Sequence, residues 1–186
     1  MKQLILLLLT AFALTHVRAQ QAQITSTVTP EIEVCGGNVA MGFKVINTNG
    51  TALTNPLFRV SLPPGIEYVA QSLSESTNQG VAEQNVAQDT ALLFQMNALP
   101  AGDSAIFTLL VEAKMAAIDY QDIGGVFRND VTFTYTSGSD NHQSDSYNIL
   151  YPAFSILSVT PNAQTIVSGT STQRSITIIN GGNGKI

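Results

Sequence analysis

Residues that usually mark catalytic or metal-binding sites are scarce in this 186-residue sequence, which has no tryptophan, one cysteine and two histidines. A tetrahedral zinc site draws its ligands mostly from Cys and His, and nucleophilic catalysis commonly pairs a Ser or Cys with a His base. Cys35 and His142 are the only Cys and His after residue 20, so neither kind of site has its parts. Walker and dinucleotide-binding glycine patterns are also missing from the sequence. The composition therefore argues against an enzyme.

Long apolar runs are missing as well. The longest mostly apolar run, Leu4–Leu14, has eleven residues, whereas a membrane-spanning helix needs roughly 20. Lys2 precedes this run, and the small residue Ala19 closes the "VRA" that follows it, which is the layout of a secretory signal peptide. We therefore predict a signal peptide over residues 1–19, cleavage before Gln20, and export to the cell surface or the extracellular space. No membrane span is predicted in the mature chain.

Charge is sparse and leans acidic, with 13 Asp and Glu against 8 Lys and Arg. The basic residues are scattered along the chain, so no basic patch of the kind that binds nucleic acid is predicted. A single cysteine is unusual for an exported protein, in which cysteines mostly pair. Two interpretations of Cys35 stay open: a buried or half-buried free thiol where a strand meets a turn, and a disulfide to a part of the protein outside this sequence.

Apolar and polar residues alternate in many short segments, while no long window carries the spacing of an amphipathic helix. Gly, Pro and Asn turns separate these segments, a pattern typical of an antiparallel β-sandwich. The predicted strands are Ile24–Val34, Val39–Ile46, Leu57–Leu62, Ile66–Leu73, Leu92–Met96, Ala105–Ala113, Val131–Tyr135 and Ser146–Tyr151. Gln71–Asp89 is predicted to be mostly loop, and Met115–Ile123 to hold one short helical turn. The predicted fold class is all-β.

The beginning of the sequence recurs near its end. "VTP" at Val28–Pro30 returns at Val159–Pro161, and four further positions repeat at a constant offset of 133 residues. These positions are Val34, Gly36, Ile46 and Asn47, which align with Val167, Gly169, Ile179 and Asn180. Self-similarity at a fixed spacing is the signature of tandem modules. We therefore predict one module over residues 20–152 and the incomplete start of a second repeat over residues 153–186, whose strands should be exposed.

The stretch from Cys35 to Tyr135 resembles the bacterial cell-surface conserved repeat domain, also called domain of unknown function eleven. The matches run in the family's order: Asn47 and Gly50, then Leu62, Pro63, Gly65, Tyr68 and Val69, then Leu99 to Gly102, and finally Asn129 before Val131. Two features depart from the family pattern: Val60 stands where an acidic residue is usual, and the Asn/Gly turn is one residue longer. The resemblance implies an immunoglobulin-like β-sandwich, repeated in large exported, adhesin-like proteins, and it brings no catalytic residues.

The polar segment "SGSDNHQSDS" holds the densest cluster of candidate ligands. Asp140, Asn141 and Asp145 supply the hard oxygen donors that calcium prefers. Their spacing matches neither an EF-hand nor a calcium-binding nonapeptide repeat, so a plain hairpin turn is the leading interpretation. His142, in the same segment, is predicted to be a solvated loop residue.

Two pairs of carboxylates are further candidates, Asp119 with Asp122 and Glu31 with Glu33. Paired carboxylates are what acid–base hydrolysis of a sugar requires. Glu31 and Glu33, however, alternate along a predicted strand and are explained more simply as its solvent side. The lack of tryptophan also weakens a carbohydrate-binding interpretation, because binding sites for sugars commonly include aromatic faces.

Three positions fit patterns of glycan attachment. "NGT" at Asn49–Thr51 matches an N-glycosylation sequence, although an Asn-Gly turn needs no such role. Thr90 in "DTA" and Ser104 in "DSA" resemble the short O-glycan acceptor sites of some bacteria with surface proteins of this style. N-glycosylation at Asn49 and O-glycosylation at Thr90 and Ser104 stay hypotheses.

These patterns predict a non-enzymatic structural module, a spacer in an exported bacterial surface or adhesin-like tandem-repeat protein. No catalytic, cofactor-binding or metal-binding residue is predicted. The expected partners are neighbouring repeats of the same chain, together with a surface protein or a glycan as ligand, and no nucleic acid. Two alternatives stay open: a ligand-binding module for glycan, protein or calcium, and an accessory domain of a larger secreted enzyme.

Overall fold

The computed structural model describes residues 20–85, 91–152, 154–160, 175–182 and 184. The predicted signal peptide over residues 1–19 lies outside the described residues, and so do Thr90 and two positions of the repeat, Val167 and Gly169. Among the residues that are described, no helix has the length and apolar character to cross a membrane.

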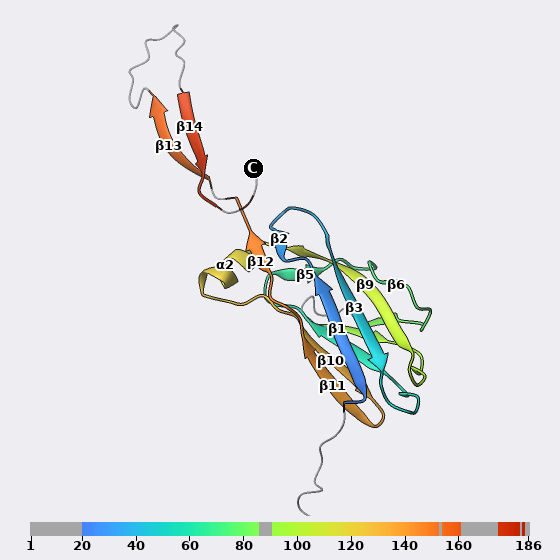
Figure 1. Cartoon of the computed structure of the whole chain (residues 1–186). Helices are drawn as coiled ribbons and strands as arrows, with labels where there is room; N and C mark the ends of the chain where they lie inside the picture. Colours follow the sequence, from blue (N-terminus) through green and yellow to red (C-terminus); the bar gives the residue numbers. More distant parts are fainter. Residues whose placement is uncertain (1–19, 86–90, 153, 161–174, 183, 185–186) are drawn as a thin grey trace, which may run out of the picture.

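One antiparallel sheet contains the strands in the order β1-β3-β9-β5, and β6 also pairs with β9. Its strands are β1 (Ala22–Val28), β3 (Val39–Asn47), β5 (Ile66–Tyr68), β6 (Ser74–Glu75) and β9 (Ser104–Ala113). In Figure 1, β1, β3 and β9 run side by side along one layer of the molecule.

A second antiparallel sheet has the order β11-β10-β4-β8-β7. Its strands are β4 (Leu57–Ser61), β7 (Ala82–Asn85), β8 (Ala91–Gln95), β10 (Asp130–Tyr135) and β11 (Gly138–Gln143). Two smaller sheets complete the fold. In one, β2 (Glu31–Glu33) pairs in parallel with β12 (Asn148–Leu150), and in the other, β13 (Phe154–Thr160) pairs antiparallel with β14 (Ser175–Asn180).

Alternate residues of the two large sheets point inward and meet in one apolar core. At its centre lie five buried phenylalanines, two from the first sheet and three from the second: Phe43 and Phe107, then Phe58, Phe94 and Phe133. The rings of Phe58 and Phe107 meet edge-on, with 4.9 Å between centroids and an interplanar angle of 88°, a geometry that aromatic pairs favour. The predicted all-β class is confirmed: the fold is an immunoglobulin-like antiparallel β-sandwich.

Two segments that the sequence analysis predicts as loops contain strands. β7 lies within the predicted loop Gln71–Asp89, and β11 lies within the polar segment after Tyr135. Both are edge strands of the second sheet, and the burial of β11 alternates only between half-exposed and exposed residues. An edge strand that buries no side chain shows no apolar alternation, so hydrophobic periodicity does not reveal it.

Three predicted strands are shorter than expected, and Ser146–Tyr151 is reduced to β12 (Asn148–Leu150). Ile24–Val34 divides into β1 and β2 at Pro30, whose nitrogen has no proton to donate to a ladder. Ile66–Leu73 ends as a strand at Tyr68, because Gln71 adopts a left-handed backbone conformation with a φ of 62° and the chain turns there.

The predicted helical turn is confirmed as α2 (Ala116–Asp122), which packs on the corner made by Pro63, Pro64 and Gly65. The backbone N–H of Lys114 donates to the carbonyl oxygen of Gly65 at 2.8 Å. Gly65 has a φ of 79°, and a Cβ there would lie 2.1 Å from the backbone nitrogen of Ala117. Only glycine therefore allows the helix to approach the corner this closely.

The β13–β14 hairpin extends beyond the end of the sandwich that carries α2 (Figure 1). Its strand β14 exposes 57% of Ile176 and 59% of Ile178. The exposure expected for the strands of this segment is confirmed for β14.

Candidate functional site

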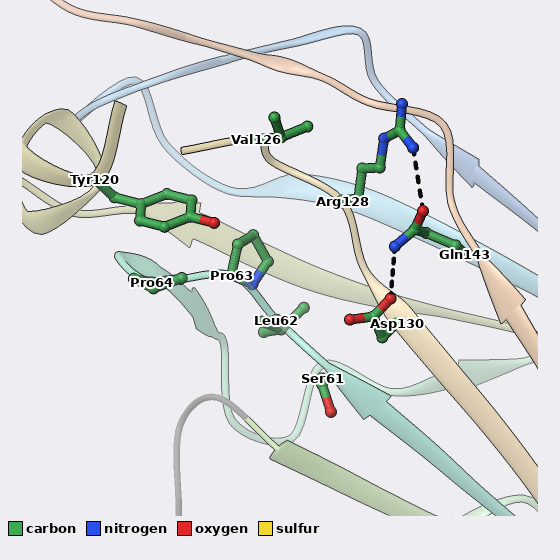
Figure 2. A pocket seen from close by; sticks show the side chains of 9 residues that line it. All are labelled: Ser61, Leu62, Pro63, Pro64, Tyr120, Val126, Arg128, Asp130 and Gln143. Carbon is green, nitrogen blue, oxygen red and sulfur yellow. Dashed lines mark hydrogen bonds between the residues drawn. The ribbon is translucent and has the colours of Figure 1, made fainter. Parts of the chain in front are cut away.

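A groove with a volume of about 540 Å³ lies where the second sheet meets α2 (Figure 2). Three separate stretches of chain form it: the end of β4 with the proline corner, the segment from α2 into β10, and the end of β11. The residues that line it are Ser61, Leu62, Pro63, Pro64, Tyr120, Val126, Arg128, Asp130 and Gln143. The groove is thus built at strand ends and at a fixed corner of the sandwich.

One wall of the groove is apolar. Tyr120, on α2, packs edge-on against the buried ring of Phe127, with 5.2 Å between centroids and an interplanar angle of 85°. This contact fixes the ring, and Figure 2 shows its hydroxyl end directed toward Pro63. Val126 adds an exposed aliphatic side chain beside it. The wall offers a small, rigid apolar surface.

A row of three planar polar side chains forms the other wall. The Nη1 of Arg128 donates to the Oε1 of Gln143 at 3.1 Å, and the Nε2 of Gln143 donates to the Oδ1 of Asp130 at 2.9 Å (Figure 2). Asp130 and Gln143 are also direct neighbours in the register of β10 and β11. The row is therefore held in place by hydrogen bonds and by paired strands before any ligand arrives.

Tyrosines with perturbed pKa values lie outside the groove lining. Burial raises the pKa of Tyr147 above its ordinary value, and the Tyr147 hydroxyl donates to the buried Oδ1 of Asn129 at 3.2 Å. Burial, followed by a hydrogen bond to Glu83, raises the pKa of Tyr68. Both shifts favour the neutral phenol and mark structural hydrogen bonds.

The structure does not gather the proposed calcium ligands on one face. Asp140 and Asn141 are successive residues of β11, so their side chains point to opposite sides of the sheet. The Oδ2 of Asp140 accepts hydrogen bonds from the backbone N–H of Ala22 at 2.8 Å and from the hydroxyl of Tyr135 at 2.9 Å. Within the described residues, no group of three or more His, Cys, Asp or Glu is placed to hold a metal ion. The carboxylate of Asp140 instead ties β11 to β1.

His142 is not the solvated loop residue that the sequence predicts. It lies on β11 opposite Val131, and its Nε2 is 2.9 Å from the hydroxyl of Ser26 on β1. With the Asp140 contacts, this bond closes the seam between the edge strands of the two sheets. The prediction is wrong because this polar segment forms an edge strand, which apolar alternation does not reveal.

Cys35 is exposed, so the predicted burial of its thiol is wrong. It begins the turn that continues through Gly36 and Gly37, and its own φ is 62°. Glu31 and Glu33 flank the buried Ile32 on β2, as their alternation predicted. The disulfide interpretation stays a hypothesis.

The remaining candidates are dispersed. Asp119 and Asp122 are exposed on α2, a different element from the β2 strand that carries Glu31 and Glu33. Asn49 bonds within its own turn, because its Nδ2 donates to the Oγ1 of Thr51 at 3.0 Å. Ser104 is the half-buried first residue of β9. No candidate residue from the sequence analysis lines the 540 Å³ groove.

The groove residues were missed because no short sequence pattern contains them. Tyr120, Arg128 and Gln143 come from a helix, a strand entry and a different strand, which only the fold brings together. Leu62 and Pro63, two positions of the family pattern, are the one local sequence signal that belongs to the groove.

No protein-family model matches the sequence, and the search of curated proteins found no match. Among solved structures, the chain is similar to the N-terminal domain of the Streptococcus gordonii adhesin Sgo0707, with 11% identity and a TM-score of 0.48 over 69% of this chain and 32% of that one. The pilus backbone of Streptococcus pneumoniae gives 14% identity and a TM-score of 0.47 over 70% of this chain and 34% of that one. The sixth cohesin of Acetivibrio cellulolyticus scaffoldin B gives 14% identity and a TM-score of 0.45 over 70% of this chain and 99% of that one. At these identities the likeness is one of fold alone.

Proposed function

We propose that residues 20–152 are a non-catalytic structural module of an exported bacterial surface protein, which spaces other parts of that protein in a tandem array. The observation that carries this proposal is the closure of the core. The buried apolar side chains from Ala22 to Ile149 form one continuous core. A unit that buries its own core without help from its neighbours is what a repeated spacer requires.

The hairpin supports the start of a second module over residues 153–186. β13 pairs antiparallel with β14, as β1 pairs antiparallel with β3 in the first module.

The placement of the strands supports a rod-like arrangement of modules. In Figure 1, β1 begins at the end of the sandwich opposite to β12, from which the chain continues into β13. Modules joined in this way extend along one direction instead of folding back. At the joint, Pro152 fixes its own φ, and a Cβ on Gly184 would lie 2.6 Å from the carbonyl carbon of Tyr151. This close contact restricts the hinge.

Small-angle X-ray scattering on tandem chains tests the spacer. One, two and three copies would be joined after Pro152, each added copy beginning at Ala22. We expect the maximum dimension to grow by a constant increment with every copy. Replacing Tyr151 and Pro152 with Gly-Ser serves as the matched control, and it should reduce the increment. Increments that shrink with each added copy of the unaltered joint would reject the proposal.

A further inference from the structure

We propose that the groove between α2 and the second sheet is a binding site for a neutral saccharide. This role is separate from spacing, so either proposal stands if the other fails. The volume of about 540 Å³ falls within the range of about 300–1,000 Å³ that is typical of small-molecule sites. The chemistry of the two walls then narrows the class of ligand.

The polar wall selects a ligand without net charge. Arg128 and Asp130 carry opposite charges, and Gln143 connects them through hydrogen bonds at 3.1 and 2.9 Å. A charged ligand would meet attraction from one end of this row and repulsion from the other. A sugar hydroxyl both donates and accepts, so neighbouring hydroxyls are able to donate to the Asp130 carboxylate and accept from the Arg128 guanidinium.

The apolar wall suits the C–H face of a sugar ring. Tyr120 is half-buried and packs against Phe127, so the groove receives the part of its ring that stays exposed, next to Pro63. The groove therefore contains an aromatic side chain, although the sequence has no tryptophan. Because the ring and the polar row are held by packing and strand pairing, binding would require little ordering of the protein.

The surface next to the groove extends the site. A second hollow of about 460 Å³ shares Asp130 and Gln143 with it, and it continues over Thr132 on β10 and Asn141 on β11. These two side chains are short and polar. The two hollows together give room for an oligosaccharide longer than one ring.

A peptide fits the same surface less well. Peptides commonly bind by adding a strand to a free sheet edge, but β4 and β10 are each paired on both sides. The outer edge of β11 lies against β1 through the contacts of Ala22 with Asp140 and of Ser26 with His142. Although β11 has no strand paired on its outer side, the adjoining β1 obstructs the addition of a strand there, which favours the saccharide.

The test is a printed array of neutral and acidic oligosaccharides and of peptides, probed with the whole chain without its first 19 residues. Calorimetric titration with the best neutral oligosaccharide follows. We expect saturable binding, weakened at least about tenfold, or about 1.4 kcal/mol, by Arg128→Ala and by Asp130→Asn. Tyr120→Phe, which keeps the ring, should weaken binding less. Lys44→Ala, which removes a charge from the other sheet, is the matched control and should leave affinity unchanged.

Chemical denaturation of each variant checks that it is folded, and the exposure of Arg128 and Asp130 makes unfolding by these substitutions unexpected. Three outcomes would overturn the saccharide site. One is the lack of any neutral oligosaccharide with a Kd below about 1 mM. Another is binding that Arg128→Ala and Asp130→Asn leave intact. The third is selective capture of peptides or acidic sugars by these same residues.

Discussion

The strands β3 and β14 carry residues that align at the 133-residue offset of the sequence, yet their apolar residues have opposite environments. Phe43 and Val45 are 2% and 0% exposed, whereas the aligned Ile176 and Ile178 are 57% and 59% exposed. In the sandwich, β9 pairs with the second edge of β3, and Phe58 from the opposite sheet packs against Phe43. In the described hairpin, β14 pairs only with β13. The same strand pattern is therefore buried only where a second layer covers it.

The turn that follows β3 shows the same dependence on distant segments. Asn47 is fully buried, and its Nδ2 lies within 2.9 Å of the carbonyl oxygens of Thr51, Leu99 and Pro100. Its Oδ1 accepts from the N–H of Asn49 at 2.9 Å. Asn47 thus holds its own turn against the connection between β8 and β9. The Asn at position 47 therefore makes a side-chain contact with a distant segment as well as stabilising a local turn.

The largest expected effect distinguishes the two strands directly. Phe43→Ala removes a ring from the centre of the core and should lower the free energy of unfolding by about 3–5 kcal/mol. Ile176→Ala, at the aligned position, should change it by less than about 0.5 kcal/mol because this side chain is already exposed. Urea denaturation of both variants measures the difference. Equal losses would mean that β14 belongs to the same cooperative unit.

Two glycines provide a second matched pair. Gly65→Ala introduces a Cβ against the backbone of Ala117 at a φ of 79°, and it should cost about 3 kcal/mol. Gly184→Ala meets the backbone of Tyr151 with a similar clash, but outside the sandwich core. It should leave the thermal midpoint unchanged and increase amide exchange in β14. A lowered midpoint for Gly184→Ala would contradict the separation of the two regions.

The buried amide gives a smaller effect. Asn47→Ala removes the bonds of its Nδ2 to the carbonyls of Thr51, Leu99 and Pro100 and takes the side-chain acceptor away from the N–H of Asn49, so we expect a loss of about 2 kcal/mol in unfolding free energy. Asn180→Ala, at the aligned position, is the control and should have no effect on the sandwich. The denaturant midpoints of the two variants, each compared with that of the unaltered chain, measure these effects. An Asn47→Ala variant with an unchanged free energy of unfolding would show that the bonds of Asn47 to Leu99 and Pro100 add no stability.

High pH should destabilise the sandwich through Tyr147. Its pKa in the folded state is raised above the ordinary value of 10.0, because burial disfavours the phenolate. Below pH 10 the Tyr147 hydroxyl is neutral in both the folded and the unfolded chain, so its contribution to the free energy of unfolding is complete there. This contribution is lost as the pH rises from 10 toward the higher folded-state pKa, because the unfolded chain releases its proton first. Stability should fall by about 1.4 kcal/mol per pH unit for this group. Denaturation curves of Tyr147→Phe should show a weaker decline; an unchanged decline would exclude Tyr147 as its source.

The sequence predicted the parts of the fold that bury alternate side chains. The central strands β3, β4, β8, β9 and β10 follow directly from positions such as Phe43, Phe58 and Phe107. It missed β7 and β11, because edge strands need no apolar alternation. The groove could not be predicted, because Tyr120, Arg128 and Gln143 meet only through the packing of three segments. The exposure of Cys35 was not predicted, because the composition of the segment does not show that this residue adopts a positive φ at the start of a turn.

The central claim is that the sandwich is complete within residues 20–152 and that residues 153–186 belong to another folding unit. The most direct measurement compares the urea unfolding of residues 20–152 with that of residues 20–186, together with amide exchange of β14. We predict unfolding free energies that agree within about 0.5 kcal/mol and rapid exchange in β14. A shorter chain that is unfolded or markedly less stable, or a β14 as protected as β3, would contradict the account.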